Sequence, residues 1–170
     1  MKKWSLLTLV GADQQAIVAA VTRVLAEADC ELGETSMMRM GGSFAMMLRV
    51  RHENQDLATL LKEVCGQLSL HLHIDDDVDT ASSAMEPDVN ITVYGADRSG
   101  IVAEVTGILA TAGLNIIDLE TAMAGTADKP IYIMTIEGQA LQGVDALTEA
   151  AKMISDGVEL NIIPIQTLRA

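Results

Sequence analysis

The residues of this chain best suited to chemistry lie in one turn, Asp97-Arg98-Ser99-Gly100, immediately before an apolar stretch that begins at Ile101. A turn that opens a helix exposes unpaired backbone N–H groups at the positive end of the helix dipole, where a carboxylate binds favourably. Gly100 lacks a Cβ atom and lets a ligand approach the backbone closely. The Asp97 carboxylate and the Asn115 side-chain oxygen are acceptors for an ammonium group. The turn therefore suits a carboxylate, and the two acceptors suit an ammonium group.

Each of these residues also has a purely structural interpretation. Asp is common at turns and helix N-caps, so Asp97 could cap the helix without touching a ligand. Gly100 could relieve backbone strain, which is compatible with ligand approach. Ala96, Ile101 and Ile116 would line the pocket and set its size. Because one methylene in such a pocket is worth about 1–3 kcal/mol, the sequence does not distinguish glycine, serine and alanine.

Metal and catalytic chemistry find little support elsewhere in the sequence. His71 and His73 share one face of a predicted strand and precede Asp75. No third ligand has a fixed spacing, so we expect no metal. The acidic run 75–79 lacks the Gly and the terminal Glu of a calcium loop. Phosphate-loop, dinucleotide and nucleophile-elbow motifs are absent, and no His has a paired Ser or Cys motif. We therefore predict neither an enzyme nor a cofactor.

Length and charge exclude several classes of protein. The 170 residues suit two small domains or one ordinary domain, and 24 acidic against 11 basic residues give a net charge of −13. That balance disfavours direct nucleic-acid binding, which needs clustered Lys and Arg. No apolar run reaches the roughly 20 residues of a membrane span, and the N-terminus does not resemble a signal peptide. Cys30 and Cys65 form no metal or disulfide pattern, so we expect structural thiols in a cytoplasmic protein.

An internal repeat places the turn in a larger unit. Gly11-Ala12-Asp13 recurs 84 residues later as Gly95-Ala96-Asp97, and 11 of 18 positions are identical between residues 11–28 and 95–112. Two unrelated amphipathic helices would share apolar spacing, but not the turn and the Thr as well. We infer a duplication.

Each half predicts the order strand, helix, strand, strand, helix, strand. The predicted strands are 6–10, 32–40, 44–51, 70–74, 89–94, 116–124, 131–137 and 158–165, and the apolar helix faces lie within 17–28, 57–68, 101–112 and 144–154. Gly41-Gly42 suits a tight hairpin, whereas Gly125–Pro130 predicts a longer connection. The predicted fold class is α+β, with two tandem ferredoxin-like βαββαβ units, each a four-stranded antiparallel sheet with both helices on one face.

The predicted domains are residues 1–75 and 88–170, joined by an acidic linker at 76–87. One face of each sheet would lack helices, and pairing with another unit or chain would cover it, so we expect a homodimer. The residues expected to pack at such an interface are Met37, Met38, Met40, Met46 and Met47. We expect Arg39, Arg49 and Arg51 to form an ion-paired strand edge.

The βαββαβ order combined with Gly-Ala-Asp-Arg-Ser-Gly-Ile-Val at the first turn resembles the ACT domain, as does Ala112-Gly113-Leu114-Asn115-Ile116. A stand-alone pair of such units is similar to the glycine cleavage system transcriptional repressor family. The resemblance implies amino-acid binding between paired units, where the turn and Asn115 lie beside each other. The implied ligand-binding residues are Ala96, Asp97, Arg98, Ser99, Gly100, Ile101, Asn115 and Ile116.

The first half departs from the ACT pattern. Gln14-Gln15-Ala16 replaces Arg98-Ser99-Gly100, and Glu31 stands where Asn115 stands. Capping alone would explain Asp13, so Asp13, Gln14, Gln15 and Ala16 are weaker candidates for ligand binding.

Three functions follow in order of support. The first is a cytoplasmic regulatory protein that binds a glycine- or serine-like amino acid and signals by contact with a regulatory protein partner, with indirect regulation of transcription of the glycine cleavage genes as one form. The second is a ligand-free interaction scaffold, which the altered first turn favours. An enzyme comes third, because no motif supports one.

Overall fold

The computed structural model describes residues 2–76, 85–95, 99–126 and 128–165. The chain divides into two compact units, Met1–Ser82 (unit 1) and Ser83–Ala170 (unit 2). Residues 77–84 of the predicted linker lie outside the described residues.

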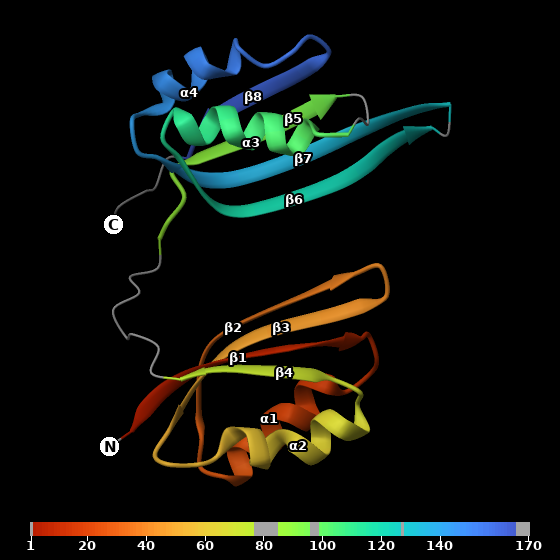
Figure 1. Ribbon diagram of the computed structural model, residues 1–170, viewed down its shortest axis with the longest axis vertical. Helices are drawn as coiled ribbons and strands as arrows, with labels where there is room; N and C mark the ends of the chain where they lie inside the picture. The colour runs from red at the N-terminus through yellow and green to blue at the C-terminus, as the bar shows by residue number, and fades with distance from the viewer. Residues whose placement is uncertain (1, 77–84, 96–98, 127, 166–170) are drawn as a thin grey trace. The chain divides into compact units, whose positions relative to one another are not determined.

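Each unit has the predicted order of elements (Figure 1). In unit 1 these are β1 (Lys3–Ala12), α1 (Ile17–Glu27), β2 (Glu31–Met40), β3 (Ser43–His52), α2 (Leu57–Gln67) and β4 (His71–Asp76). In unit 2 they are β5 (Val89–Gly95), α3 (Ile101–Thr111), β6 (Leu114–Thr126), β7 (Lys129–Ala140), α4 (Val144–Ala151) and β8 (Val158–Pro164).

Both units form the predicted ferredoxin-like sheet. The strand orders are β2-β3-β1-β4 and β6-β7-β5-β8, and every neighbouring pair is antiparallel. The two helices of each unit contact each other and cover one face of its sheet (Figure 1). In the part of the chain that the structure describes, the other face of each sheet carries no helix of its own unit (Figure 1). Within the described residues, no helix is long and apolar enough to cross a membrane.

Each core is formed by every second side chain of the inner strands and by the apolar face of each helix. In unit 1, Leu7 and Leu9 of β1 pack against Val21 and Leu25 of α1, all fully buried. Unit 2 repeats the arrangement with Ile91, Val93, Val105 and Leu109. Equivalent positions of the repeat thus perform the same packing role, which explains why the apolar spacing is shared.

Glycine turns form as predicted at Gly41-Gly42 and at Gly113. Gly41 and Gly42 have φ of 55° and 81° and form the predicted two-residue hairpin between β2 and β3. After α3, Gly113 adopts a φ of 86°, while Asp29 takes a φ of 55° at the equivalent place after α1. The prediction of a long 125–130 connection is wrong, because β6 and β7 remain paired as far as Thr126 and Lys129.

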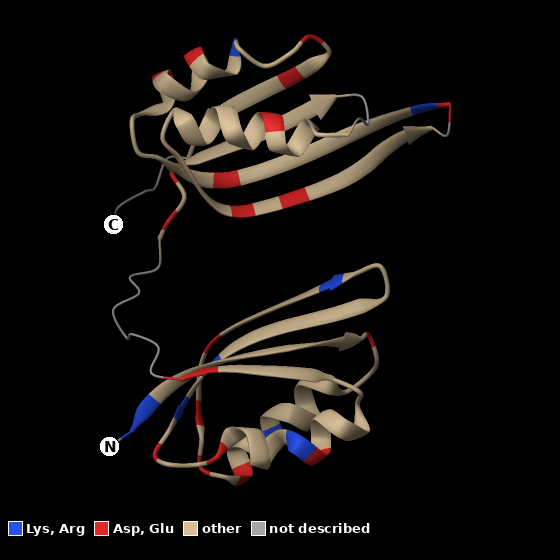
Figure 2. Cartoon of the chain, viewed as in Figure 1, with Lys and Arg blue, Asp and Glu red and all other residues tan. Residues whose placement is uncertain are grey.

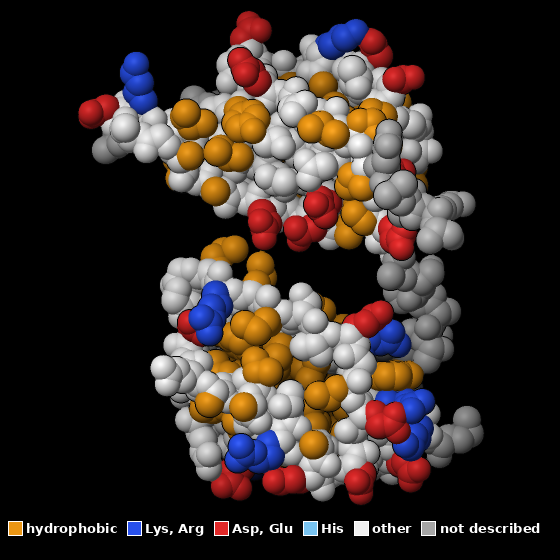
Figure 3. Space-filling view, turned by 180° about the vertical axis from the view of Figure 1, so that it is seen from behind, with side chains coloured by type: hydrophobic (Ala, Val, Ile, Leu, Met, Phe, Trp, Pro, Cys, Tyr) orange, Lys and Arg blue, Asp and Glu red, His pale blue; other side chains and the backbone are white. Residues whose placement is uncertain are grey.

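The methionine cluster divides between the core and the surface. Met46 is only 1% exposed and belongs to the core of unit 1, because it lies on the helix-facing side of β3. The interface interpretation is therefore wrong for this residue. The other four, Met37, Met38, Met40 and Met47, are 46–70% exposed on β2 and β3. Figure 3 shows hydrophobic side chains gathered on the surface of unit 1.

Candidate functional site

The candidate turn of unit 2 lies between the end of β5 and the start of α3. Ala96, Asp97 and Arg98 lie outside the described residues, whereas Ser99 and Gly100 form an exposed turn. Gly100 is the N-cap residue of α3, with φ of 87° and ψ of −2°. This left-handed conformation strains any residue that carries a Cβ atom, so glycine is the residue the backbone requires. Since Gly100 has no side chain to cap the helix, the N–H groups of the first turn suit an anion.

One acidic side chain lies in the first turn of α3. Glu104 accepts hydrogen bonds from the backbone N–H of Ser155 at 2.9 Å and from its hydroxyl at 2.5 Å. A carboxylate near a helix N-terminus complements the helix dipole. Glu104 therefore attaches α3 to the segment before β8, and it adds negative charge near the place proposed for an anion.

The Asn115 half of the predicted site lies at the opposite end of the sheet. Gly95, the last residue of β5, pairs with Tyr132 of β7, whereas Asn115 pairs with Gln139 of the same strand. The seven residue steps between these β7 partners span roughly 23 Å. The Asn115 side chain donates a hydrogen bond to Sδ of Met85 at 3.4 Å. One small amino acid therefore cannot touch both the turn and the Asn115 of the same unit.

The two isoleucines predicted to line the pocket pack into the core of unit 2. Ile101 is 2% exposed, and Ile116 is half-buried against the same cluster. A Cβ atom on Gly95 would meet Cδ1 of Ile101 at 3.0 Å, so β5 and α3 approach closely here. Ile101 thereby fixes the position of the first turn of α3 relative to the sheet.

A shallow depression of about 390 Å³ occurs beside the same end of β5. Its lining residues are Tyr94, Gly95, Pro130, Ile131, Gly157 and Glu159. Tyr94 and Glu159 are register partners on β5 and β8, and they point away from the core because Val93 points into it. The depression therefore opens on the helix-free face of the sheet, whereas α3 covers the other face.

In unit 1, side chains of the chain itself occupy the equivalent turn. The Asp13 carboxylate lies 3.2 Å from Nε of Arg39. Nε2 of Gln14 donates a hydrogen bond to the backbone oxygen of Leu68 at 2.7 Å, at the end of α2. These contacts leave Asp13 and Gln14 engaged within unit 1.

The cap of α1 also differs from the expectation. Its N-cap residue is Ala16, with φ of 67°. The methyl side chain of Ala16 makes no capping hydrogen bond. The interpretation of Asp13 as a helix cap is therefore wrong, because its carboxylate pairs with Arg39. Gln15 is exposed beside Ala16. An alanine in this conformation carries strain that Gly100 avoids in unit 2.

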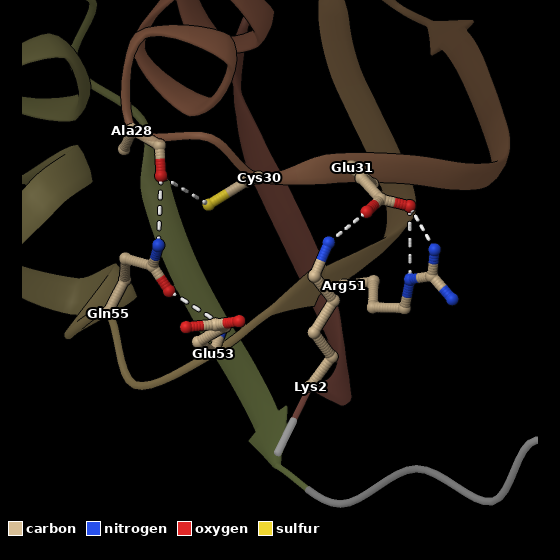
Figure 4. A network of polar contacts seen from close by, with 7 residues as sticks. All are labelled: Lys2, Ala28, Cys30, Glu31, Arg51, Glu53 and Gln55. Atoms are coloured by element: carbon tan, nitrogen blue, oxygen red, sulfur yellow. Dashed lines mark hydrogen bonds and ion pairs between the residues drawn. The ribbon is translucent and has the colours of Figure 1, made fainter.

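Glu31, the counterpart of Asn115, is ion-paired in unit 1 (Figure 4). Its carboxylate contacts Nζ of Lys2 and the guanidinium of Arg51, whose Nε lies at 3.1 Å. Hydrogen bonds from Lys2 and then Arg51 lower the pKa of Glu31 below its ordinary value. Together with Arg39–Asp13 and an Arg49–Glu34 pair at 3.5 Å, this confirms that the three arginines are ion-paired. The expected strand edge is wrong for Arg49 and Arg51, because β3 is an inner strand of the sheet.

His73, Cys30 and Cys65 are the remaining candidates for metal or thiol chemistry. His73 lies 3.2 Å from Asp75, and among the described residues no three His, Cys, Asp or Glu side chains are placed to hold a metal ion. Cys30 and Cys65 are free and buried. Burial raises the pKa of both thiols, and the Asp29 charge adds to the effect at Cys30. The thiol form is therefore favoured at both positions.

Sequence reasoning missed one buried polar cluster in unit 1. The Ser5 hydroxyl lies 2.9 Å from Nε2 of His52 and donates a hydrogen bond to Oδ1 of Asp76 at 2.8 Å. Ser5 is fully buried and His52 is 2% exposed. The three residues are far apart in the chain, and only the register of β1 with β3 and β4 brings them together. A hydroxyl with no exposed surface does not act as a nucleophile, so the cluster is structural.

The fold defines the class of this protein: a tandem pair of ferredoxin-like βαββαβ modules. The ACT domain profile matches residues 4–75 and 88–140, and the chain belongs to the ACT domain family. The UPF0237 protein YjhC of Lactococcus lactis is 34% identical over 76 residues, which cover 43% of this chain and 87% of that protein.

Two solved structures share the whole fold. An unknown protein from Galdieria sulphuraria has a TM-score of 0.79 at 22% identity, covering 98% of this chain and 100% of that one. A protein proposed to be a glycine cleavage system transcriptional repressor has a TM-score of 0.68 at 15% identity, covering 97% and 99%. At these identities the likeness concerns the fold.

Proposed function

We propose that this chain is a cytoplasmic regulatory protein that binds a small α-amino acid, glycine- or serine-like, at the turn before α3 and signals through contact with a regulatory protein. The observation that carries the proposal is the difference between the two turns. In unit 1, Asp13 and Gln14 are engaged by the chain itself. In unit 2, a Cβ atom added at Gly100 would meet no described atom within 4 Å.

The chemistry of the ligand follows from the groups at this turn. The N-terminus of α3 suits the carboxylate of the amino acid. The ammonium group needs an acceptor, which Asp97 and the Asn115 oxygen of a second unit would supply. Because one unit places its own Asn115 roughly 23 Å from its turn, two units must combine. We therefore propose a homodimer in which the ligand favours one arrangement of paired units over another.

The proposed partner is a protein rather than a nucleic acid. A net charge of −13 opposes direct contact with phosphates. If the chain regulates transcription, as the fold relative named for glycine cleavage suggests, a separate protein must bind the DNA.

Thermal unfolding with glycine, serine and alanine tests the proposal. A ligand that binds the folded state at about 100 times its Kd stabilises it by about 2.7 kcal/mol, so we expect a rise in Tm. Asp97→Ala and Asn115→Ala should abolish that rise. The matched control variants are Asp13→Ala and Glu31→Ala, which change the equivalent positions of unit 1 and should keep it.

The alternative is an interaction scaffold that binds no ligand, and the self-occupied turn of unit 1 is the observation that favours it. Calorimetry separates the two functions. No heat of binding and no change in Tm with any common amino acid would leave the scaffold as the function and exclude the sensor.

A further inference from the structure

The helix-free face of the unit 2 sheet carries a row of carboxylates. Asp118 of β6 is the register partner of Glu137 of β7, and Glu120 lies two residues further along β6. These side chains point away from the core, because Leu119 and Ile136 pack into it. Figure 2 shows the three acidic positions on the adjacent strands β6 and β7. Like charges directly opposite each other destabilise a strand pair, so this row is suited to an external cation.

Unit 1 carries a cation, Arg49, at the position equivalent to Glu137. Arg49 pairs with Leu6 of β1, and Glu137 pairs with Asn90 of β5. Leu6 and Asn90 are 84 residues apart, the offset of the repeat, so Arg49 and Glu137 occupy equivalent places. Arg49 lies 3.5 Å from Glu34, which is the counterpart of Asp118. An opposite-charge pair in unit 1 is therefore a like-charge pair in unit 2.

Unit 2 offers few cations to compensate this row. In its described residues the basic side chains are Lys129 and Lys152. Lys152 is paired with Glu149 on α4, at the helical side of the sheet. Lys129 begins β7 at the hairpin, eight residue steps and roughly 27 Å from Glu137. The uncharged amide of Asn90 donates a hydrogen bond to Glu137 at 3.5 Å and supplies no positive charge.

The face also has apolar side chains and the depression beside β5. Tyr94, Ile131 and Ile163 are 42%, 44% and 50% exposed. Tyr94 and Ile131 line the depression together with Glu159, so an apolar wall and a carboxylate lie side by side. Figure 3 shows hydrophobic and acidic side chains together on unit 2. Such a wall and carboxylate suit a Lys or Arg side chain, whose stem is apolar and whose end is charged.

We infer that this surface, which we call the acidic face (Tyr94, Asp118, Glu120, Ile131, Glu137 and Glu159), binds the regulatory partner, and that the partner presents apolar side chains flanked by Lys or Arg. The inference rests on the proposed function, which requires a protein partner. The same face of a second copy is not the occupant, because every charged side chain of this face is a carboxylate and a two-fold contact of the face with itself would bring like charges together. Charge complementarity of this kind governs partner choice and association rate.

A charge-reversed copy of the full chain serves as the probe of defined chemistry. Asp118→Lys, Glu120→Lys and Glu137→Lys together keep the apolar side chains and replace the carboxylates with cations. We expect sedimentation velocity to detect a complex of this variant with the wild type that neither protein forms alone. Its association constant should fall at least about tenfold between about 0.05 and 0.5 M salt.

The matched control carries the same change of charge elsewhere on unit 2, as Asp128→Lys, Glu149→Lys and Asp156→Lys. These side chains are exposed and lie outside the acidic face. Equal binding by the control, or no complex with a folded probe, overturns the inference. If the probe does not fold, Asp118→Asn, Glu120→Gln and Glu137→Gln replace it, and this neutral variant should self-associate more than the wild type. An unchanged oligomeric state would then overturn the inference.

The amino-acid test and the docking test fail separately. Stabilisation by glycine or serine without any complex would refute docking at the acidic face and would support the amino-acid sensor. A complex that forms without any amino-acid effect on Tm would support the acidic face and exclude the sensor.

Discussion

The buried hydroxyl of Ser5 lies 2.9 Å from Nε2 of His52, across the β1–β3 pair of unit 1. The same hydroxyl donates a hydrogen bond to Asp76 on β4. One small side chain thus connects three of the four strands at the end of the sheet. His52 is nearly inaccessible to water, so its hydrogen bond to Ser5 replaces solvation.

Ser5→Ala should destabilise the chain by about 1–3 kcal/mol, because it removes a hydrogen-bond partner from two polar groups, one of them buried. Urea unfolding of the full chain measures the change. The matched control is Ser36→Ala on β2, where the side chain is exposed. A loss no larger than that of the control would contradict the structural role of Ser5.

The Asp76 carboxylate should add an acid-dependent component to stability. The Ser5 hydrogen bond, with Lys3 nearby, lowers the pKa of Asp76 in the folded chain. A lowered folded-state pKa stabilises the protein above the ordinary carboxyl pKa of about 3.9, and that stabilisation disappears as pH falls below it. Between about pH 5 and pH 3, Asp76→Asn should therefore lose less stability than the wild type. Chemical unfolding at each pH measures the free energy of unfolding of both proteins. An equal fall in the two proteins between about pH 5 and pH 3 would contradict the prediction.

Two glycines of unit 2 should respond to alanine in opposite directions. A Cβ atom at either position would meet no described atom within 4 Å, but Gly100 has φ of 87°, whereas Gly107 lies inside α3. Gly100→Ala should cost about 1 kcal/mol, and Gly107→Ala should stabilise by about 0.5–1 kcal/mol. Ala16→Gly in unit 1 should also stabilise, since Ala16 has φ of 67°. Thermal unfolding of the three variants tests the sign of each change.

Gly33→Ala should disturb the single tryptophan. A Cβ atom at Gly33 would lie 2.8 Å from Cζ3 of Trp4, whose ring is stacked under the guanidinium of Arg49 at 4.9 Å. Overpacking of this kind costs about 1–3 kcal/mol, and we expect a shift in Trp4 fluorescence. Gly66→Ala is the control, because its Cβ atom would meet nothing within 4 Å. Equal behaviour of the two variants would contradict the close contact.

Much of the fold could be predicted because its signals are local. The turn and helix spacing that repeat after 84 residues specified two βαββαβ units, and the positive φ of Gly41 and Gly42 followed from residue type. The same local logic failed at 125–130, where a glycine and a proline predicted a loop but cross-strand pairing extended the hairpin. Met46 was assigned to a surface because composition does not state which face of a strand a residue occupies.

The site was predicted less completely, since its partners are distant in the chain. Residue types alone pointed to Gly100 and to the weaker turn of unit 1. Only the register of the strands placed Asn115 at the far end of the sheet from the turn, and only it set Glu137 against Asp118. The sequence by itself determined the repeated module, because hydrophobic periodicity and turn chemistry act over a few residues. The tertiary structure decided which charged and polar groups meet, because those contacts depend on strand pairing between segments far apart in the chain.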